Sequence, residues 1–265
     1  MPISVLTLKD IYYFAFYWIS SALMERRRKG PKAWFSFLNP DLSPLDQEPH
    51  FFDKDSLEWI AKFEEKYPII KKELEEFLEK KKLSSFTPYF NTEMVSTAKS
   101  WSNLALRFWD IDYPEFADDF KETKKILDTC LPSCTTISFN HLAPHSTIYP
   151  HHGDTNAIVR CHLGITVPAS LPEVGFKVGT SSRSWEEGKV LPFCDAHKHT
   201  AFNNSNEGRI ILLFDVMRKQ YEGDRKLVCY TVLKSIYTQK VYFARYKIAF
   251  CILIPLLLAV LYFLI

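Results

Sequence analysis

Hydrophobic periodicity divides the chain into a helical first part and a strand-rich second part. After Pro68, apolar side chains recur at the spacing of one helix face, at Ile70, Leu74, Phe77 and Leu78. Glu and Lys alternate around this stripe and form a solvated face. Because proline suits the first turn of a helix, the pattern predicts a helix that begins near Pro68.

The sequence predicts two more helices and an aromatic stretch before and after this helix in the first half of the chain. Asp55 or Ser56 is a suitable N-cap for a helix that runs to about Tyr67. Residues 86–113 are aromatic and strand-like, and residues 116–127 have the apolar spacing of a short helix.

From residue 135 the periodicity becomes that of strands. Short β-rich runs, separated by turns of Pro, Gly, Asn and Ser, occupy residues 135–142, 157–167, 175–178, 189–193 and 209–216. Several short strands at this spacing are typical of an antiparallel sandwich or barrel. We therefore predict a mainly β fold, for which a jelly roll would surround a ligand-sized cavity with inward side chains.

The predicted organisation has six parts. They are an N-terminal membrane-interfacial segment (1–30), a proline-rich linker (31–54), a helical and aromatic part (55–130), the β core (131–228), a basic juxtamembrane segment (229–247) and a transmembrane helix (248–265).

The two ends of the chain carry the membrane signals. Residues 248–265 are uncharged and apolar, and 18 residues span roughly 27 Å as a helix, close to the thickness of a hydrocarbon core. Arg245 and Lys247 precede this stretch, which predicts a membrane protein with its domain on the cytoplasmic side. Residues 11–24 are apolar and basic residues follow at 26–29, which predicts an interfacial anchor on anionic headgroups, or alternatively a short span.

Charge and cysteine content exclude other classes of protein. The formal net charge is only +2, so the chain is not expected to bind nucleic acid. The six cysteines show neither the spacing of a secreted disulfide framework nor that of a zinc site. We expect free thiols in a reducing compartment.

Two histidine clusters and an arginine carry the candidate chemistry. His151 and His152 form the first cluster, His197 and His199 the second, and Arg209 follows ten residues after His199. Neutral imidazoles suit a non-haem iron that keeps open positions for a chelating cosubstrate and dioxygen. The planar guanidinium suits the distal carboxylate of a dicarboxylate cosubstrate.

Arg209 begins a strand that continues with five apolar residues. A buried arginine needs an anionic partner, because an unpaired buried charge is costly. Arg160 and His162 alternate along another strand and therefore point to one face, where Arg160 is expected to join the carboxylate cluster. His141 and His145 are interpreted as polar turn or rim residues, and His197 has no assigned role.

Residues 142–216 resemble the aspartyl/asparaginyl β-hydroxylase family of Fe(II)/2-oxoglutarate dioxygenases. Four phrases carry the resemblance: Pro-His-x-Gly-x-Thr-Asn at 150–156, Arg-x-His-Leu-Gly at 160–164, Trp-Glu-Glu-Gly-Lys-Val at 185–190 and Arg-Ile-Ile-Leu-Leu-Phe-Asp-Val at 209–216. The resemblance implies a double-stranded β-helix, Fe(II) as cofactor, and 2-oxoglutarate and O2 as cosubstrates. It also implies oxidative decarboxylation of 2-oxoglutarate coupled to hydroxylation of an unactivated C–H bond.

The family register makes His151 and His199 the iron ligands. It places Gly153 where most 2-oxoglutarate dioxygenases carry a carboxylate, and the chain resembles the members that use two histidines with water filling the gap. The alternative register takes its ligands from His152-Gly153-Asp154, which is itself a His-x-Asp. A shift of one residue turns a strand side chain to the other face, so the two registers exclude each other. We favour His151 with His199, which leaves Asp154 as a neighbouring partner or a turn residue.

The resemblance also suggests which residues bind 2-oxoglutarate. Arg209 would hold its distal carboxylate, with Arg160 beside it, and His162 resembles the histidine through which the family contacts the cosubstrate. Asn140 and Leu142 occupy positions where family members also contact it.

We therefore predict a membrane-anchored hydroxylase that acts on a fatty acyl chain of a membrane lipid. One alternative is an aspartyl/asparaginyl residue hydroxylase with a protein or peptide substrate. Another is a catalytically silent, membrane-bound binding module, which the glycine at 153 would favour. A third is a zinc-dependent hydrolase with Asp154 as general base. Residues 185–188 are predicted to form a turn with no catalytic role.

Overall fold

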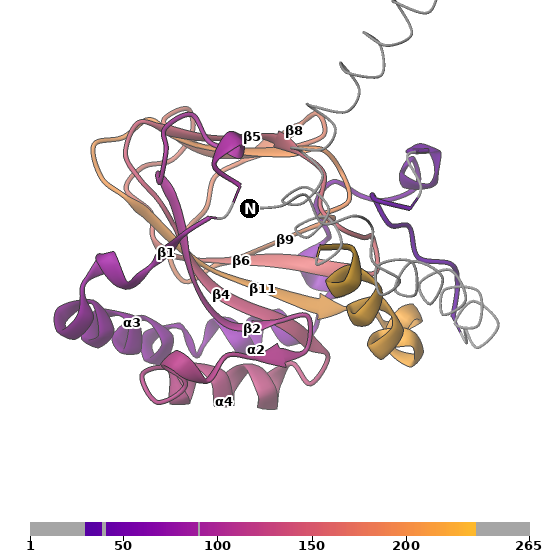
Figure 1. Cartoon of the computed structure of the whole chain (residues 1–265), viewed down its shortest axis with the longest axis horizontal. Coiled ribbons are helices and arrows are strands. Elements are labelled where there is room, and N and C mark those ends of the chain that lie inside the picture. The colour runs from indigo at the N-terminus through magenta and orange to yellow at the C-terminus, as the bar shows by residue number, and fades with distance from the viewer. Residues whose placement is uncertain (1–29, 39–40, 90, 237–265) are drawn as a thin grey trace, which may run out of the picture.

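Two facing antiparallel sheets form the centre of the computed structural model, which describes residues 30–38, 41–89 and 91–236 (Figure 1). The larger sheet contains β1 (Thr87–Pro88), β2 (Trp101–Phe108), β3 (Ile111–Asp112), β4 (Cys134–Leu142), β6 (Ile158–Thr166), β9 (Val190–Phe193) and β11 (Arg209–Met217). The smaller sheet contains β5 (Ser146–His151), β7 (Val174–Val178), β8 (Ser181–Arg183) and β10 (His199–Asn203).

The strand order identifies the core as a jelly roll. The neighbours are β4-β11-β6-β9 in one sheet and β5-β10-β7-β8 in the other, so successive strands change sheets at every step except from β7 to β8. Eight strands wound in this way form a double-stranded β-helix. The mainly β prediction is confirmed, and the five predicted strands appear as β4, β6, β7, β9 and β11, within one residue at each end.

The predicted transmembrane helix at 248–265 lies outside the described residues, as does the predicted anchor at 11–24. Within the ranges described, no helix has the length and apolar character needed to cross a bilayer.

The helices are α2 (Trp59–Glu64), α3 (Tyr67–Lys81), α4 (Lys121–Cys130) and an unlabelled helix at residues 225–236. Short 3-10 turns are η1 (Ser43–Leu45), η2 (Lys54–Ser56), η3 (Leu83–Ser85), η4 (Thr92–Met94), η5 (Pro114–Phe116) and η6 (Lys219–Asp224). The α3 prediction is confirmed, with proline in its first turn. The helix predicted to run from Asp55 or Ser56 to Tyr67 is instead split into η2 and α2, because the Asp53 carboxylate caps a single turn by accepting from the Asp55 N–H.

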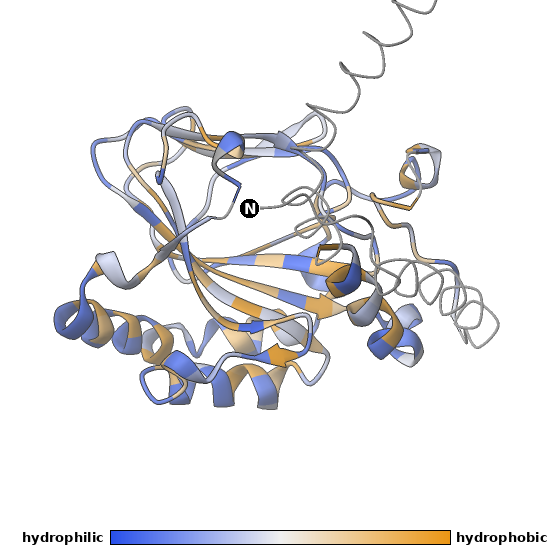
Figure 2. Cartoon of the chain, viewed as in Figure 1, coloured by the Kyte–Doolittle hydropathy of each residue, from blue (hydrophilic) through white to orange (hydrophobic). Residues whose placement is uncertain are grey.

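Helices α2, α3 and α4 cover the outer face of the larger sheet (Figure 1), where hydrophobic segments of both layers meet (Figure 2). Successive side chains of β11 point alternately towards these helices and into the barrel interior. Leu212 and Phe214 pack among the helices, whereas Ile211 and Leu213 belong to the interior cluster with Phe176 and Phe193.

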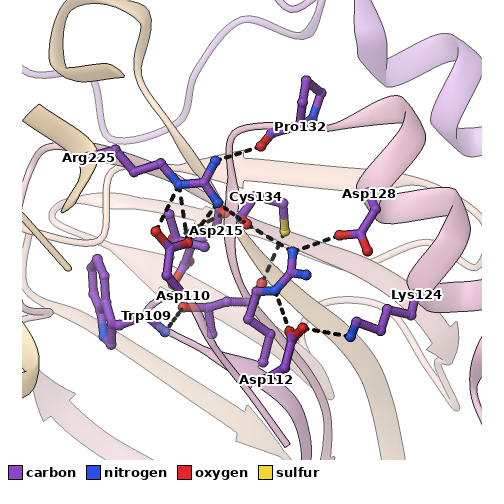
Figure 3. Close-up of polar contacts among 12 residues, drawn as sticks. Trp109, Asp110, Asp112, Lys124, Asp128, Pro132, Cys134, Asp215 and Arg225 are labelled. Carbon is purple, nitrogen blue, oxygen red and sulfur yellow. Dashed lines mark hydrogen bonds and ion pairs between the residues drawn. The ribbon is translucent and has the colours of Figure 1, made fainter. Parts of the chain in front are cut away.

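A polar cluster ties the helix at 225–236 to one end of the larger sheet (Figure 3). Arg225 bonds the Asp110 carboxylate at 2.7 Å and donates to the carbonyls of Pro132 and Cys134. Apolar residues of this helix, including Val228 and Val232, pack on the same end.

The segment predicted as a linker at 31–54 packs against the β core. Trp34 and Leu45 are buried, and Phe51 forms an isolated bridge with Phe193 of β9. The Glu48 carboxylate accepts from Arg218 at 2.8 Å, which holds this segment beside the end of β11. The expectation of free thiols is confirmed for the five cysteines described, Cys130, Cys134, Cys161, Cys194 and Cys229.

Candidate active site

His151 and His199 lie side by side in the smaller sheet. His151 ends β5 and His199 begins β10, the two are paired in register, and their ring centroids are 4.2 Å apart. Each Nδ1 lies 2.8 Å from a backbone carbonyl two residues earlier, that of Tyr149 for His151 and that of His197 for His199. A carbonyl only accepts, so both Nδ1 atoms carry the proton and both Nε2 lone pairs are free for a metal.

Burial favours the neutral form of both imidazoles. It lowers the pKa of His151 and, together with the neighbouring His151, holds the pKa of His199 well below its usual range. Metal binding requires neutral histidine, so the pair is ready to bind a cation at neutral pH.

His152 occupies a different environment. Its Nδ1 hydrogen-bonds to the Ala196 carbonyl at 2.9 Å, and its ring lies 6.5 Å from that of Trp34. Burial, followed by repulsion from Asp195, raises the pKa of Asp154 to about 7, so this carboxyl is partly protonated at neutral pH. The geometry thus brings His151, rather than His152, to His199.

Asp195 is a functional candidate that the sequence did not reveal. It is fully buried, its Oδ1 is 3.6 Å from His199 Nε2, and its Oδ2 has no hydrogen-bond partner among the described residues. A Cβ added at Gly153 would collide with Asp195 Oδ2. The carboxylate therefore occupies the space that a side chain at 153 would need. The only local signal was an aspartate four residues before His199.

Arg160 holds Asp195 in place. Its Nη1 donates to Asp195 at 2.6 Å, while its Nε and Nη2 donate to both oxygens of Asp215 at 2.7 and 2.8 Å. Arg160 and His162 do lie on the interior side of β6, as expected, but the contacts of Arg160 are with protein carboxylates. Its predicted role in binding the cosubstrate stays a prediction.

Arg209 forms a second polar centre in the barrel. It is 2% exposed, and its Nε and Nη1 have no hydrogen-bond partner in the described part of the chain. Its guanidinium lies over the ring of Trp185, 4.5 Å from the centroid, and burial lowers its pKa to about 9. The expected burial of Arg209 is confirmed, and the partner it requires is absent from the described residues.

His162 lies close to Arg209. The Trp185 indole N–H donates to His162 Nδ1 at 3.2 Å. Burial, followed by the charge of Arg209, holds the pKa of His162 well below its usual range. Residues 185–188 do form a loop, but Trp185 is buried against two candidate site residues, which the interpretation of this segment as a plain turn missed.

Two aromatic rings join the histidine pair to this second centre. Phe176 lies 5.2 Å from the ring of His162 and 5.8 Å from that of His199, and Phe193 lies 4.8 and 5.6 Å from the same two rings. The two centres thus belong to one apolar barrel interior.

The two remaining predicted cosubstrate contacts lie on β4. Asn140 accepts from the Trp101 indole at 3.2 Å and donates to the Ser138 hydroxyl at 2.8 Å. Leu142 is buried and pairs with Arg209. Both therefore line the strand beside Arg209, and their contact with a cosubstrate stays a prediction.

Of the two histidines interpreted as turn or rim residues, His145 lies in a turn, whereas His141 lies within β4, paired with Ser102 and Ile210. His145 is in a turn with φ of 50° and hydrogen-bonds to Asn206 at 3.1 Å. His197 hydrogen-bonds to the Glu48 carbonyl at 2.9 Å. Among the described residues, no group of three or more His, Cys, Asp or Glu side chains has the geometry of a metal site. The paired imidazoles, whose Nε2 lone pairs are free, are the groups that would suit a metal with open coordination positions.

The fold and the two polar centres define a jelly-roll protein with a buried histidine pair and a buried arginine. Residues 64–219 match the model of the Aspartyl/Asparaginyl beta-hydroxylase family, and the chain belongs to this family.

Proteins similar to this chain are named either as a lipid acyl hydroxylase or as aspartyl/asparaginyl or aspartate beta-hydroxylases. The ornithine lipid ester-linked acyl 2-hydroxylase of Rhizobium tropici is 28% identical over 188 residues, which is 70% of this chain and 66% of that protein. The aspartyl/asparaginyl beta-hydroxylase of Mus musculus is 34% identical over 80 residues, 30% of this chain and 10% of that protein. The aspartate beta-hydroxylase domain-containing protein 2 of Xenopus tropicalis is 40% identical over 78 residues, covering 28% and 20%. The chain thus spans less than two thirds of each of these relatives.

Solved structures show only weak similarity to the chain. A Cupin 2 conserved barrel domain protein from Salinispora arenicola has a TM-score of 0.32 and 9% identity, over 53% of this chain and 87% of that one. A viral collagen prolyl hydroxylase from Paramecium Bursaria Chlorella virus-1 has a TM-score of 0.30 and 10% identity, over 44% and 77%. Neither adds to the topology given above.

Proposed function

We propose that the protein is an Fe(II)/2-oxoglutarate-dependent hydroxylase that acts on a fatty acyl chain of a membrane lipid. The observation that carries the proposal is Arg209, a buried cation with two unpaired N–H groups in the same barrel as a histidine pair. An uncompensated buried charge is costly, and a bidentate carboxylate would satisfy it.

Five residues of the barrel interior have defined roles in this proposal. His151 and His199 would hold Fe(II), which when bound supplies the redox chemistry that activates dioxygen and decarboxylates 2-oxoglutarate to succinate. Asp195, held by Arg160, places a negative charge beside the cation. Arg209 would orient 2-oxoglutarate by its distal carboxylate, and the surrounding aromatic rings exclude water.

Two observations and one prediction from the sequence favour a lipid as the substrate. The match to the Rhizobium lipid acyl 2-hydroxylase extends over 188 residues, against 80 for the mouse protein. Trp101 is stacked on Tyr89 at 3.7 Å and lies 6.4 Å from the ring of His151, so an aromatic border suited to an acyl chain adjoins the histidine pair. The predicted segments at 11–24 and 248–265 would hold the domain at the cytoplasmic face of a membrane.

A protein substrate is the second candidate, since several relatives are named as aspartyl/asparaginyl hydroxylases. The deciding experiment incubates the purified full-length chain with Fe(II), 2-oxoglutarate and either membrane lipid extract or Asp- and Asn-containing peptides. Succinate is measured together with the mass of the substrate, and the His199→Ala variant is the control. We expect succinate and a lipid that gains one oxygen. Oxidised peptide with unchanged lipid would establish the alternative.

A binding module without catalytic activity is distinguished in the same preparation. It would form no succinate with any substrate and would not bind 2-oxoglutarate.

Truncation after Thr238 provides an independent test of the lipid assignment. It removes no residue of the candidate site, so 2-oxoglutarate binding should persist. Oxidation of lipid in vesicles should fall through lower local concentration, and detergent-dispersed lipid should restore much of it. Equal activity of both forms on vesicles would remove the membrane argument for a lipid.

A further inference from the structure

Trp185 contacts both residues of the proposed carboxylate pocket in two different ways. It lies in the loop between β8 and β9 and is 2% exposed. Its indole N–H faces His162 of β6, and its ring face lies under Arg209 of β11. The side chain of Trp185 thus links β6, through its indole N–H, to β11, through the face of its ring.

The edge contact determines the tautomer of His162. An indole nitrogen only donates, so the His162 Nδ1 that lies 3.2 Å from Trp185 Nε1 must be an acceptor. Burial and the charge of Arg209 hold the pKa of His162 well below its usual range, so the ring is neutral. A neutral imidazole with a bare Nδ1 carries its proton on Nε2. His162 is therefore an N–H donor through Nε2.

The contact with the ring face of Trp185 orients Arg209 and leaves its N–H groups free to donate. A guanidinium stacked on an indole is held through its π face, while its N–H groups point outward in its own plane. The guanidinium carbon of Arg209 lies 4.5 Å from the centroid of the Trp185 ring, and the unpaired Nε and Nη1 agree with a contact through the face of the guanidinium.

We propose that Trp185 is a positioning residue of the cosubstrate pocket, which sets His162 in its Nε2–H form and holds Arg209 flat, so that both residues offer N–H donors to the distal carboxylate of 2-oxoglutarate. This inference rests on the proposed function. It assigns a role to a residue that makes no contact with the reacting atoms.

The first test reads the tautomer directly and does not depend on catalysis. The full-length chain, labelled with 15N-histidine and loaded with Zn2+ in detergent, is studied by long-range 1H–15N correlation. The His162→Gln variant assigns the His162 signal. We expect a protonated Nε2 and a bare Nδ1 at neutral pH. A protonated Nδ1 would overturn the proposal.

The second test compares 2-oxoglutarate with 2-oxopentanoate, which has a methyl group in place of the distal carboxylate. Trp185→Phe keeps a ring face and removes the N–H donor. Its Kd for 2-oxoglutarate should rise about tenfold, the loss expected for one hydrogen bond, and its Kd for 2-oxopentanoate should not change. Trp109→Phe is the matched control, since Trp109 is equally buried and its indole nitrogen has no partner among the described residues.

An equal rise in the Kd of both ligands, or an unchanged Kd for 2-oxoglutarate, would show that Trp185 only fills space. If the unsubstituted protein does not distinguish the two ligands, the proposed function itself fails. The tautomer measurement still decides the role of Trp185 towards His162 in that case, and also when the phenylalanine variant does not fold.

Discussion

Replacement of Arg209 by methionine should change stability and cosubstrate binding in opposite directions. Arg209 is buried, and two of its N–H groups are unpaired in the described structure. Without cosubstrate, this charge opposes folding, and burial already lowers its pKa to about 9. Methionine has a similar length and no charge, so it fills the space beside Trp185 without that cost.

The expected sizes follow from this environment. Replacing an uncompensated buried charge by a well-packed apolar side chain stabilises by ~1–3 kcal/mol, which corresponds to a rise in Tm of about 2–10 °C for a domain of this size. Loss of one side of a desolvated charge pair costs ~2–5 kcal/mol of binding, or about 30- to 5,000-fold in the Kd of 2-oxoglutarate. Lysine at 209 should recover only part of this binding, because it cannot form the bidentate contact.

The assay combines thermal melting with calorimetric titration of 2-oxoglutarate, under anaerobic conditions with Fe(II) bound. The unsubstituted protein should melt higher when 2-oxoglutarate is added, and Arg209→Met should lose this shift. Arg183→Met is the control, since Arg183 is an exposed arginine that lies over Phe51. A methionine variant with unchanged affinity for 2-oxoglutarate would refute the role of Arg209, whatever its stability.

Three further predictions concern the histidine end of the barrel and its surroundings. His151→Ala should abolish iron binding and turnover, whereas His152→Ala should leave both measurable, and the reverse result would establish the other register. Gly153→Asp should lower Tm and iron binding because its side chain meets Asp195, and adding Asp195→Ala should restore both; a Gly153→Asp variant as stable as the parent would count against this packing. Burial, with the charge of Arg209, lowers the pKa of His141 to about 4, so its neutral form contributes stability that is present above pH 6.5 and is lost as the pH falls towards 4. His141→Gln should remove up to about 2 kcal/mol of that acid sensitivity in urea titrations at pH 7 and pH 5, and an unchanged difference would exclude His141 as its source.

The strands that could be predicted are those in which apolar and β-branched residues predominate. β4, β6 and β11 are buried on both faces, by helices on one side and by the barrel interior on the other, so Val, Ile, Leu, Phe and Thr occupy most of their positions. β5 and β10, which carry the two histidines, are not among the five predicted strand runs. β10 alternates between buried and half-buried positions over only five residues, and its inward side chains include His199 and Asn203.

The site residues that were missed depend on contacts between distant segments. Asp195 reaches the histidine pair because its carbonyl accepts from the Gly153 N–H at 2.8 Å, a contact across 42 positions that no local pattern encodes. Trp185 precedes Glu-Glu-Gly, a sequence typical of a turn, and only the fold shows that its ring is covered by Arg209. Arg209 itself was predictable, because a charge that opens an apolar strand requires a partner wherever the strand is buried.

The distribution of buried charge gives the strongest physical reason to propose that the barrel binds a metal ion together with a dicarboxylate. At the histidine end, the buried carboxylates of Asp195 and Asp215 face the single guanidinium of Arg160, which leaves this end with an excess of negative charge. At the other end, Arg209 lies without a carboxylate among the described residues. One barrel therefore favours a cation at one end and an anion at the other, and each charge offsets a desolvation cost that the protein alone leaves uncompensated. The proposed divalent metal and dicarboxylate would together meet both requirements, whereas a metal alone or a monoanion alone would leave one end of the barrel unsatisfied.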